Sequence, residues 1–224
     1  MARLHVLRVF TNEDGEWGNR LGVVLDGAAI ATAQRQAMAT ELGFSETVFV
    51  EDRATGRIRI HTPSVELPFA GHPAVGTAWL LRREGTEATA LRPTAGTVGV
   101  RVDDEGTFVD ADPAWAPEFE FRRHGSPAEV RALRPDRASE DNLYAWAWID
   151  EDAGTIRARA FVPEAGIPED EATGSAALAL CARLGRPVTV HQGHGSVLRA
   201  RPLGEGRAEV GGLVRLDGTR EISP

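Results

Sequence analysis

Two short segments of this chain are apolar on almost every side, and they limit what it can fold into. Residues 74–81 read Ala-Val-Gly-Thr-Ala-Trp-Leu-Leu, and residues 176–181 read Ala-Ala-Leu-Ala-Leu-Cys. A helix without a polar face is buried on all sides, and segments of this length are too short to cross a membrane. Each segment therefore predicts a core helix that strands surround.

The two predicted helices, residues 72–82 and 174–184, both follow a turn of small residues. The turns read Ala70-Gly71-His72-Pro73 and Ala172-Thr173-Gly174-Ser175. Pro73 suits the first position of a helix, and Gly85 suits the end of one. The two turns therefore predict that a similar local architecture occurs twice.

Most of the remaining chain reads as short strands, because β-branched or alternating apolar residues are separated by turn residues. The predicted strands are residues 4–10, 22–25, 47–50, 57–61, 97–102, 107–109, 143–149, 156–162, 187–191, 197–201 and 208–215. Two further helices are predicted at residues 30–42 and 127–133. The pattern predicts an α+β fold of two similar halves, a domain of residues 1–112 and a domain of residues 113–224.

The composition excludes several classes of chemistry. The chain has no lysine, so it can form no Schiff base and has no P-loop lysine. Cys181 is the only cysteine, which excludes an internal disulfide and a two-cysteine racemase. The net charge is −8 without a basic run, so nucleic acid is not an expected partner. Residues 1–6 show no signal-peptide core, and we expect a cytoplasmic protein without a membrane span.

The starts of the two buried helices are candidate binding positions. The first backbone N–H groups of a helix are unpaired and carry partial positive charge. If the two starts face each other at Gly71 and Gly174, they would hold the carboxylate of a small substrate. The alternative is that Thr173 and Ser175 only cap the second helix, and that His72 bonds a local carbonyl.

Glu46 is a candidate proton carrier. On a strand it shares a face with Val48 and Val50. If those valines point inward, burial would raise the pKa of Glu46 toward neutrality, which suits a general acid or base. Phe49 makes the opposite face apolar as well, so a solvated glutamate at a strand edge is the alternative.

Other residues each allow two interpretations. Asp170 precedes the second core helix, where it either orients a site or only stabilises the helix start. His191 and His194 lack the spacing of two metal ligands on one strand face, and no third ligand is close in sequence, so no metal site is predicted. The alternating aromatic residues of 144–148 either pack in the core or line a ring-binding pocket.

Ordered blocks of the sequence resemble one known family. The chain reads GNRLGVVLD at 18–26, LGFSETVF at 42–49, TPSVELPFAGHP at 62–73, RAFVP at 159–163 and EDEATGSA at 169–176. These blocks resemble the motifs G-N-P-x-A-V-V-x-D, L-N-x-S-E-T-x-F, T-P-x-x-E-L-P-F-A-G-H-P, R-x-F-x-P and E-D-P-A-T-G-S-A of the PhzF-like family. Its members are isomerases of phenazine biosynthesis and their relatives, on the diaminopimelate-epimerase fold.

The resemblance implies a fold and a set of site residues. The fold has two pseudo-symmetric halves, each a strand-rich barrel around a central buried helix, with the active site in the cleft between them. The resemblance implies catalytic roles for Glu46, His72, Asp170 and Ser175, and substrate-binding roles for Gly71, Thr173 and Gly174.

The resemblance also implies a reaction that depends on one carboxylic acid. In the related epimerases, cysteines stand where Ala70 and Thr173 stand here. Glu46 would instead remove a proton from an acidic carbon and return one elsewhere on a conjugated system. The predicted function is a cofactor-independent isomerase of a small cyclic or amino carboxylate, working as a homodimer. The alternatives are a Glu46-dependent cyclase or lyase, and an inactive ligand- or protein-binding module.

The chain departs from the family pattern in three respects. Arg20 and Glu171 replace the usual prolines. The G-R-P-S element is represented here by residues 193–196, Gly-His-Gly-Ser, and the middle of the chain is short for the family. The substrate contacts near this element and the size of the pocket therefore do not follow from the resemblance.

Overall fold

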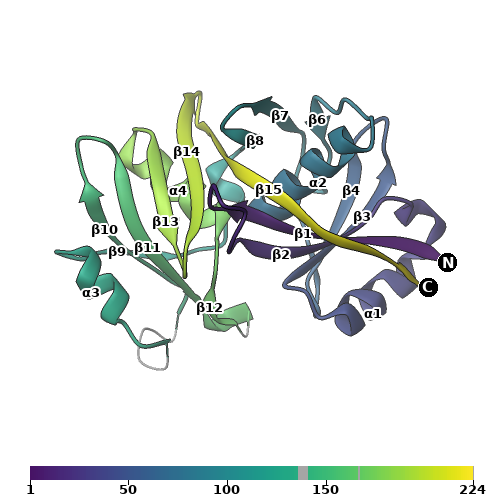
Figure 1. Ribbon diagram of the computed structural model, residues 1–224, viewed down its shortest axis with the longest axis horizontal. Coiled ribbons are helices and arrows are strands. Elements are labelled where there is room, and N and C mark those ends of the chain that lie inside the picture. Colours follow the sequence, from purple (N-terminus) through teal and green to yellow (C-terminus); the bar gives the residue numbers. More distant parts are fainter. Residues whose placement is uncertain (136–140, 166, 224) are drawn as a thin grey trace.

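The computed structural model describes residues 1–135, 141–165 and 167–223, and within them it shows two strand-rich halves joined by one sheet (Figure 1). The main path of this sheet runs β5-β4-β3-β2-β1-β15-β14-β13-β11-β10-β9. None of the described helices is both long and apolar enough to cross a membrane.

The first half contains two α-helices and eight strands among the described residues. They are β1 (Ala2–Thr11), β2 (Asn19–Val24), α1 (Thr32–Leu42), β3 (Glu46–Asp52), β4 (Arg57–His61), β5 (Glu66–Leu67), α2 (Gly71–Arg83), β6 (Ala90–Leu91), β7 (Val98–Asp103) and β8 (Gly106–Ala111), among the described residues.

The second half completes the sheet with the last strands of the chain. Its elements are β9 (Glu120–Arg123), α3 (Pro127–Ala132), β10 (Leu143–Asp150), β11 (Thr155–Val162), β12 (Ile167–Asp170), α4 (Gly174–Leu184), β13 (Val188–Gln192), β14 (Ser196–Gly204) and β15 (Arg207–Ile222). Short 3₁₀ helices lie at Gly27–Ala29, Pro113–Trp115 and Pro163–Ala165.

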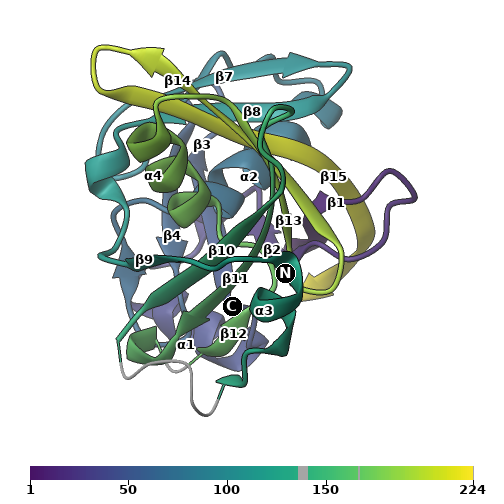
Figure 2. The same ribbon diagram turned by 90° about the vertical axis from the view of Figure 1, so that its left-hand side faces the viewer.

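Each half places one long helix inside and one shorter helix outside its sheet. The helices α2 and α4 contribute to the main cluster of buried apolar side chains, as their apolar sequences predict. Side chains on the opposite faces pack with α1 in the first half and beside α3 in the second. Figure 2, which views the molecule from the second half, shows α4 and α3 separated by β10 and β11. The predicted α+β fold of two helix-centred halves is confirmed.

The strand β15 belongs to both halves. Its first part pairs with β8 and β14, from Ala208 opposite Ala111 to Gly211 opposite Arg199. Its second part pairs with β1, so that Ile222 lies opposite Ala2 and the two chain ends lie together (Figure 1). The division of the chain at residues 112 and 113 stays a prediction, because the last strand contributes hydrogen bonds to both sides of it.

The predicted strands all coincide with observed ones, whereas the prediction missed β5, β6, β9 and β12. These four strands have two to four residues each, which is too short for an alternating pattern to be recognised. The helix α2 begins one residue earlier than predicted, at Gly71, so Pro73 is its third residue and not its first. Pro73 still lies in the first turn, where the missing N–H leaves no bond unmade.

The starts of α2 and α4 touch each other, and only glycine allows this approach. A Cβ atom placed on Gly71 would lie 3.1 Å from the Cα and carbonyl carbon of Gly174, and 3.2 Å from the backbone nitrogen of Ser175. A Cβ atom placed on Gly174 would lie 3.3 Å from the Cα of Gly71 and from the backbone nitrogen of His72. The two helix starts, far apart in the sequence, therefore form one junction.

We expect Gly71→Ala to destabilise the protein by about 1–3 kcal/mol, because the added methyl group meets backbone atoms that cannot move independently. Urea unfolding would measure the loss. Gly218→Ala is the control, since a Cβ atom there has nothing within 4 Å. Equal stability of the two variants would show that the junction tolerates a wider separation.

Candidate functional site

The junction of the helix starts carries a buried ion pair. Oε2 of Glu46, at the start of β3, lies 3.1 Å from Nε2 of His72, the second residue of α2. The two side chains are 14% and 6% exposed. Neither atom makes a well-directed hydrogen bond to any described residue, so both keep bonding capacity for a ligand.

The inward orientation of Glu46 follows from the strand that carries it. Val48 and Val50, on the same face, are buried in the main cluster with α2, whereas Phe49 packs in the separate cluster with α1. The parallel pairing of β2 with β3 sets Leu21 beside Glu46. Glu46 therefore faces inward, and the alternative of a solvated glutamate at a strand edge is wrong.

The expected pKa of Glu46 was wrong in direction. Burial acts to raise it, as the sequence argument assumed, but the charge and contact of His72 and the side chain of Ser45 outweigh burial and lower the pKa of Glu46. Burial also acts to lower the pKa of His72, but the charges of Glu46 and Asp170 raise it above its ordinary value. Each member of the pair therefore favours the charged form of the other, a carboxylate on Glu46 and an imidazolium on His72.

Asp170 supplies the second carboxyl group of the site. Its Oδ1 accepts a hydrogen bond from Nδ2 of Asn19 at 2.7 Å, and its Oδ2 accepts one from Oγ1 of Thr173 at 2.6 Å. Burial and the negative charge of Glu46 raise the pKa of Asp170 to about 6, although His72 and the two hydrogen bonds act in the opposite direction. Three titratable side chains thus share one electrostatic site.

The other predicted site residues lie at the same junction. Gly71 and Gly174 form the contact between the helices, and Ser175 is the second residue of α4. Thr173 precedes α4 and bonds Asp170 through its hydroxyl instead of capping the helix, because no side-chain cap bond is made there. The structure therefore brings all the predicted site residues together, while their roles in a reaction stay predictions.

Two residues of the site were missed by the prediction. Asn19 joins the halves, since its Nδ2 also donates to the backbone carbonyl of Ala172 at 3.1 Å. Gln192, wholly buried at the end of β13, donates to Oγ1 of Thr173 at 2.9 Å. Asn19 lies in the first block of the family resemblance, which is a signal that the prediction did not use.

Glu171 connects the site to a turn of the second half. Its carboxylate accepts hydrogen bonds from the backbone N–H of His194 at 3.0 Å and from Oγ of Ser196 at 2.8 Å, and it contacts Nδ1 of His194 at 2.8 Å. Oγ of Ser196 in turn accepts a bond from the backbone N–H of Gly18 at 3.0 Å. Trp17 stacks on His194 with 5.5 Å between the ring centroids.

These contacts form a clasp between Trp17 and Gly18 of the first half and residues 193–196 of the second. A Cβ atom on Gly195 would lie 2.3 Å from the indole of Trp17, so the turn needs glycine there. The two departures from the family pattern, Glu171 and the element of residues 193–196, therefore belong to one structure.

A surface hollow of about 390 Å³ lies beside the clasp. Asn19, which bonds Asp170, and Ser45, which precedes Glu46, both line it, together with Trp17, Arg20 and Phe44. This hollow therefore adjoins residues that contact the site, although Glu46, His72 and Asp170 do not line it.

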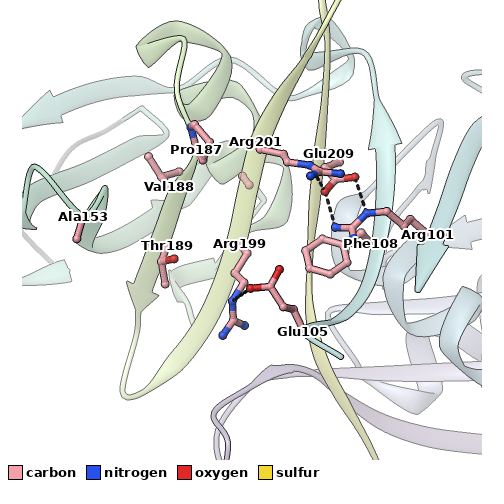
Figure 3. Close-up of a pocket in the computed structure, with 11 residues that line it drawn as sticks. Arg101, Glu105, Phe108, Ala153, Pro187, Val188, Thr189, Arg199, Arg201 and Glu209 are labelled. Carbon is pink, nitrogen blue, oxygen red and sulfur yellow. Dashed lines mark hydrogen bonds and ion pairs between the residues drawn. The ribbon is translucent and has the colours of Figure 1, made fainter. Parts of the chain in front are cut away.

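A second hollow, of about 180 Å³, is lined by residues of β7, β8, β13, β14 and β15, among others, and by none of the predicted site residues (Figure 3). Its charged groups pair with one another: Arg101 and Arg201 both contact the Glu209 carboxylate at 2.6 Å, and Arg199 lies 3.8 Å from Glu105. With its charges paired in this way, the second hollow offers no unpaired acid or base for proton transfer. Within the described part of the chain, no three or more His, Cys, Asp or Glu side chains gather as a metal site.

Comparisons with known proteins identify the family that this chain resembles. A family model described as phenazine biosynthesis-like protein matches residues 7–115. The trans-2,3-dihydro-3-hydroxyanthranilate isomerase of Pseudomonas fluorescens is 32% identical, over 86% of this chain and 87% of its own length.

Solved structures extend the likeness to the whole fold. A proposed phenazine biosynthesis PhzC/PhzF protein of Clostridium difficile superposes with a TM-score of 0.81 at 18% identity, over 100% of both chains. A predicted epimerase of Pseudomonas aeruginosa superposes with a TM-score of 0.73 at 24% identity, over 99% of both chains.

We expect Glu46→Gln to lower the pKa of His72, because burial would then be opposed by the charge of Asp170 alone. Since the folded pKa of His72 is raised, its contribution to stability is present below pH 6.5 and is lost as the pH rises through the folded pKa. NMR titration of the imidazole signals would measure the shift, with His5 as the internal control, because the charged groups that shift its pKa do not include Glu46 or Asp170. A His72 pKa that stays at the wild-type value would contradict the ion pair.

We expect Glu171→Ala to loosen the clasp, because three donors of residues 194–196 lose their common acceptor. Losing a hydrogen bond to a charged group should speed amide hydrogen exchange at His194 and Gly195 by about tenfold or more. Glu13→Ala, an exposed change in the adjoining loop, is the control. Unchanged amide hydrogen exchange at His194 and Gly195 in Glu171→Ala would show that the turn is stable without the Glu171 carboxylate.

Proposed function

Because this chain belongs to the PhzF family of phenazine biosynthesis-like isomerases, we propose that it moves a proton on a small carboxylate without a cofactor, with Glu46 as the acid and base. The observation that carries the proposal is the buried Glu46–His72 pair at the touching helix starts. The pair supplies a base, a cation and, beside them, the backbone N–H groups that a carboxylate needs.

Glu46 rests as a carboxylate, the form that accepts a proton from carbon. His72 holds its pKa low in the resting state, while burial acts to raise it. A substrate carboxylate that draws His72 away from Glu46 leaves burial as the larger effect, so Glu46 becomes a stronger base once substrate is bound. The protonated Glu46 then returns the proton to another carbon of the same substrate, and no proton is gained or lost overall.

The junction also explains how a substrate would be oriented. The starts of α2 and α4 bring the backbone N–H groups of His72 and Ser175 to the junction at Gly71 and Gly174. A carboxylate held there would place the adjacent carbon toward Glu46. Asp170 would bond an amino or hydroxyl group of the substrate.

The class of substrate is proposed from chemistry and from the relatives together. A relative is named for its action on trans-2,3-dihydro-3-hydroxyanthranilate, a cyclic amino carboxylate, so this compound is the first to test. The homodimer expected from the resemblance stays a prediction.

We expect Glu46→Gln to reduce proton transfer by about 10³-fold, within the range that general acid–base catalysis contributes. Proton NMR in D₂O, with a panel of cyclic and amino carboxylates, would measure the incorporation of deuterium at carbon. Glu41→Gln is the matched control, since Glu41 is exposed on α1 nearby in the sequence.

Deuterium exchange that persists in Glu46→Gln at the wild-type rate would exclude Glu46 as the base. Ligand-induced shifts without exchange in any sample would support a binding module on this fold instead of an isomerase.

A further inference from the structure

Asp170 is the first member of a chain of buried polar side chains that leads away from the candidate site. Thr173 bonds Asp170, Gln192 bonds Thr173 at 2.9 Å, and the hydroxyl of Tyr144 donates to Oε1 of Gln192 at 3.1 Å. Tyr144 and Gln192 are wholly buried, and Thr173 is 8% exposed. The sequence interpretations assigned no role in the site to Gln192, and they left Tyr144 in the core or in a pocket wall.

The direction of each hydrogen bond in this chain is fixed by one backbone carbonyl. Nε2 of Gln192 lies 2.9 Å from the carbonyl oxygen of Asp170, which can only accept. The amide nitrogen must therefore face that carbonyl, and its second hydrogen reaches Oγ1 of Thr173. Oε1 of Gln192 is left to accept the hydroxyl of Tyr144, whose pKa burial raises well above its ordinary value.

The hydroxyl of Thr173 consequently has one direction open to it. It already accepts the hydrogen of Gln192, so its single proton points to Oδ2 of Asp170, at 2.6 Å. Asn19 is oriented in the same way, because its Nδ2 donates both to the carbonyl of Ala172 and to Oδ1 of Asp170. Both carboxylate oxygens of Asp170 therefore accept hydrogen bonds from donors whose orientation is fixed by their other hydrogen bonds.

We propose that Gln192 is a positioning residue of the site, which orients the hydroxyl of Thr173 and so keeps Asp170 a hydrogen-bond acceptor. Asp170 then does not compete for the proton of His72, and Glu46 remains free as the base. This inference rests on the proposed function in taking Asp170 as part of the reacting site. Gln192 touches neither substrate nor Glu46 and acts only through the hydroxyl that it orients.

The groups around Asp170 explain why one hydrogen bond matters. Burial and the charge of Glu46, from β3, favour its protonation, whereas His72, from α2, and the donors Thr173 and Asn19 favour its ionisation. Tyr144, from β10, is neutral. The balance leaves the pKa of Asp170 at about 6, so losing one donor moves it toward neutrality and favours the protonated form of Asp170.

Two substitutions test this series of hydrogen bonds, one at Thr173 and one at Gln192. Thr173→Val removes the hydroxyl and keeps the shape of the side chain, so the pKa of Asp170 should rise by about one unit. Gln192→Glu replaces the donor by an acceptor, which turns the hydroxyl of Thr173 away from Asp170 and adds a negative charge, so the rise should be larger. Thr77→Val, a buried threonine in α2 whose hydroxyl has no partner among the described residues, is the matched control.

The measurement is ¹³C NMR titration of protein labelled at the aspartate carboxyl carbons, with the Asp170 signal assigned as the one missing from Asp170→Asn. Thr173→Val keeps the test available if Gln192→Glu does not fold. In the Thr173→Val background, Gln192→Glu should raise the pKa by less than it does in the wild type, because there is no hydroxyl left to redirect. A purely structural role for Gln192 would change the unfolding midpoint without moving this titration.

An Asp170 titration within about 0.3 units of the wild type in both variants would overturn the proposal. A shift in Thr173→Val without one in Gln192→Glu would overturn the role of Gln192. The titration needs no substrate, so its failure is distinct from failure of the isomerase assay. Where deuterium exchange at a substrate carbon is measurable, the acidic limb of its rate-versus-pH profile should move to higher pH by the same amount as the pKa of Asp170.

Discussion

The contact between Gly71 and Gly174 is the constraint on which the site depends. It brings the starts of α2 and α4 together, and with them His72 from one half and Thr173 and Ser175 from the other. A side chain at either glycine would push the halves apart at the point where Glu46 and Asp170 share their electrostatic environment. The shared strand β15 holds the halves in one sheet, so the junction is braced on both sides.

The electrostatics of the site show why burial alone does not predict a pKa. Burial acts to raise the pKa of Glu46, yet this pKa is lowered because His72 lies 3.1 Å away. Asp170 lacks such a partner, and its pKa is raised to about 6 even though two donors bond it. One imidazole near two carboxylates thus makes them unlike, and the lowered pKa of Glu46 and the raised pKa of His72 favour a proton on His72.

The departures of this chain from its family are concentrated around the clasp. Glu171, where a proline is usual, replaces a rigid residue by a carboxylate that binds the turn of residues 193–196. Trp17 covers a glycine of that turn, and its exposed indole lines the hollow beside the clasp. The clasp and this hollow are therefore built from the same residues, Trp17, Gly18 and Glu171.

The sequence by itself determined the two core helices, the longer strands and the set of residues that would meet. Apolar segments such as residues 176–181 can only be buried, and the small residues at Gly71 and Gly174 predicted binding positions if the two helix starts faced each other. The family resemblance, more than the local pattern, singled out Glu46 and Asp170. Only the tertiary structure decided which face of β3 is inward, which partner each acid has and in which direction its pKa moves. Those properties depend on distances between β3, α2, β13 and the start of α4, and neighbours in the sequence do not fix such distances.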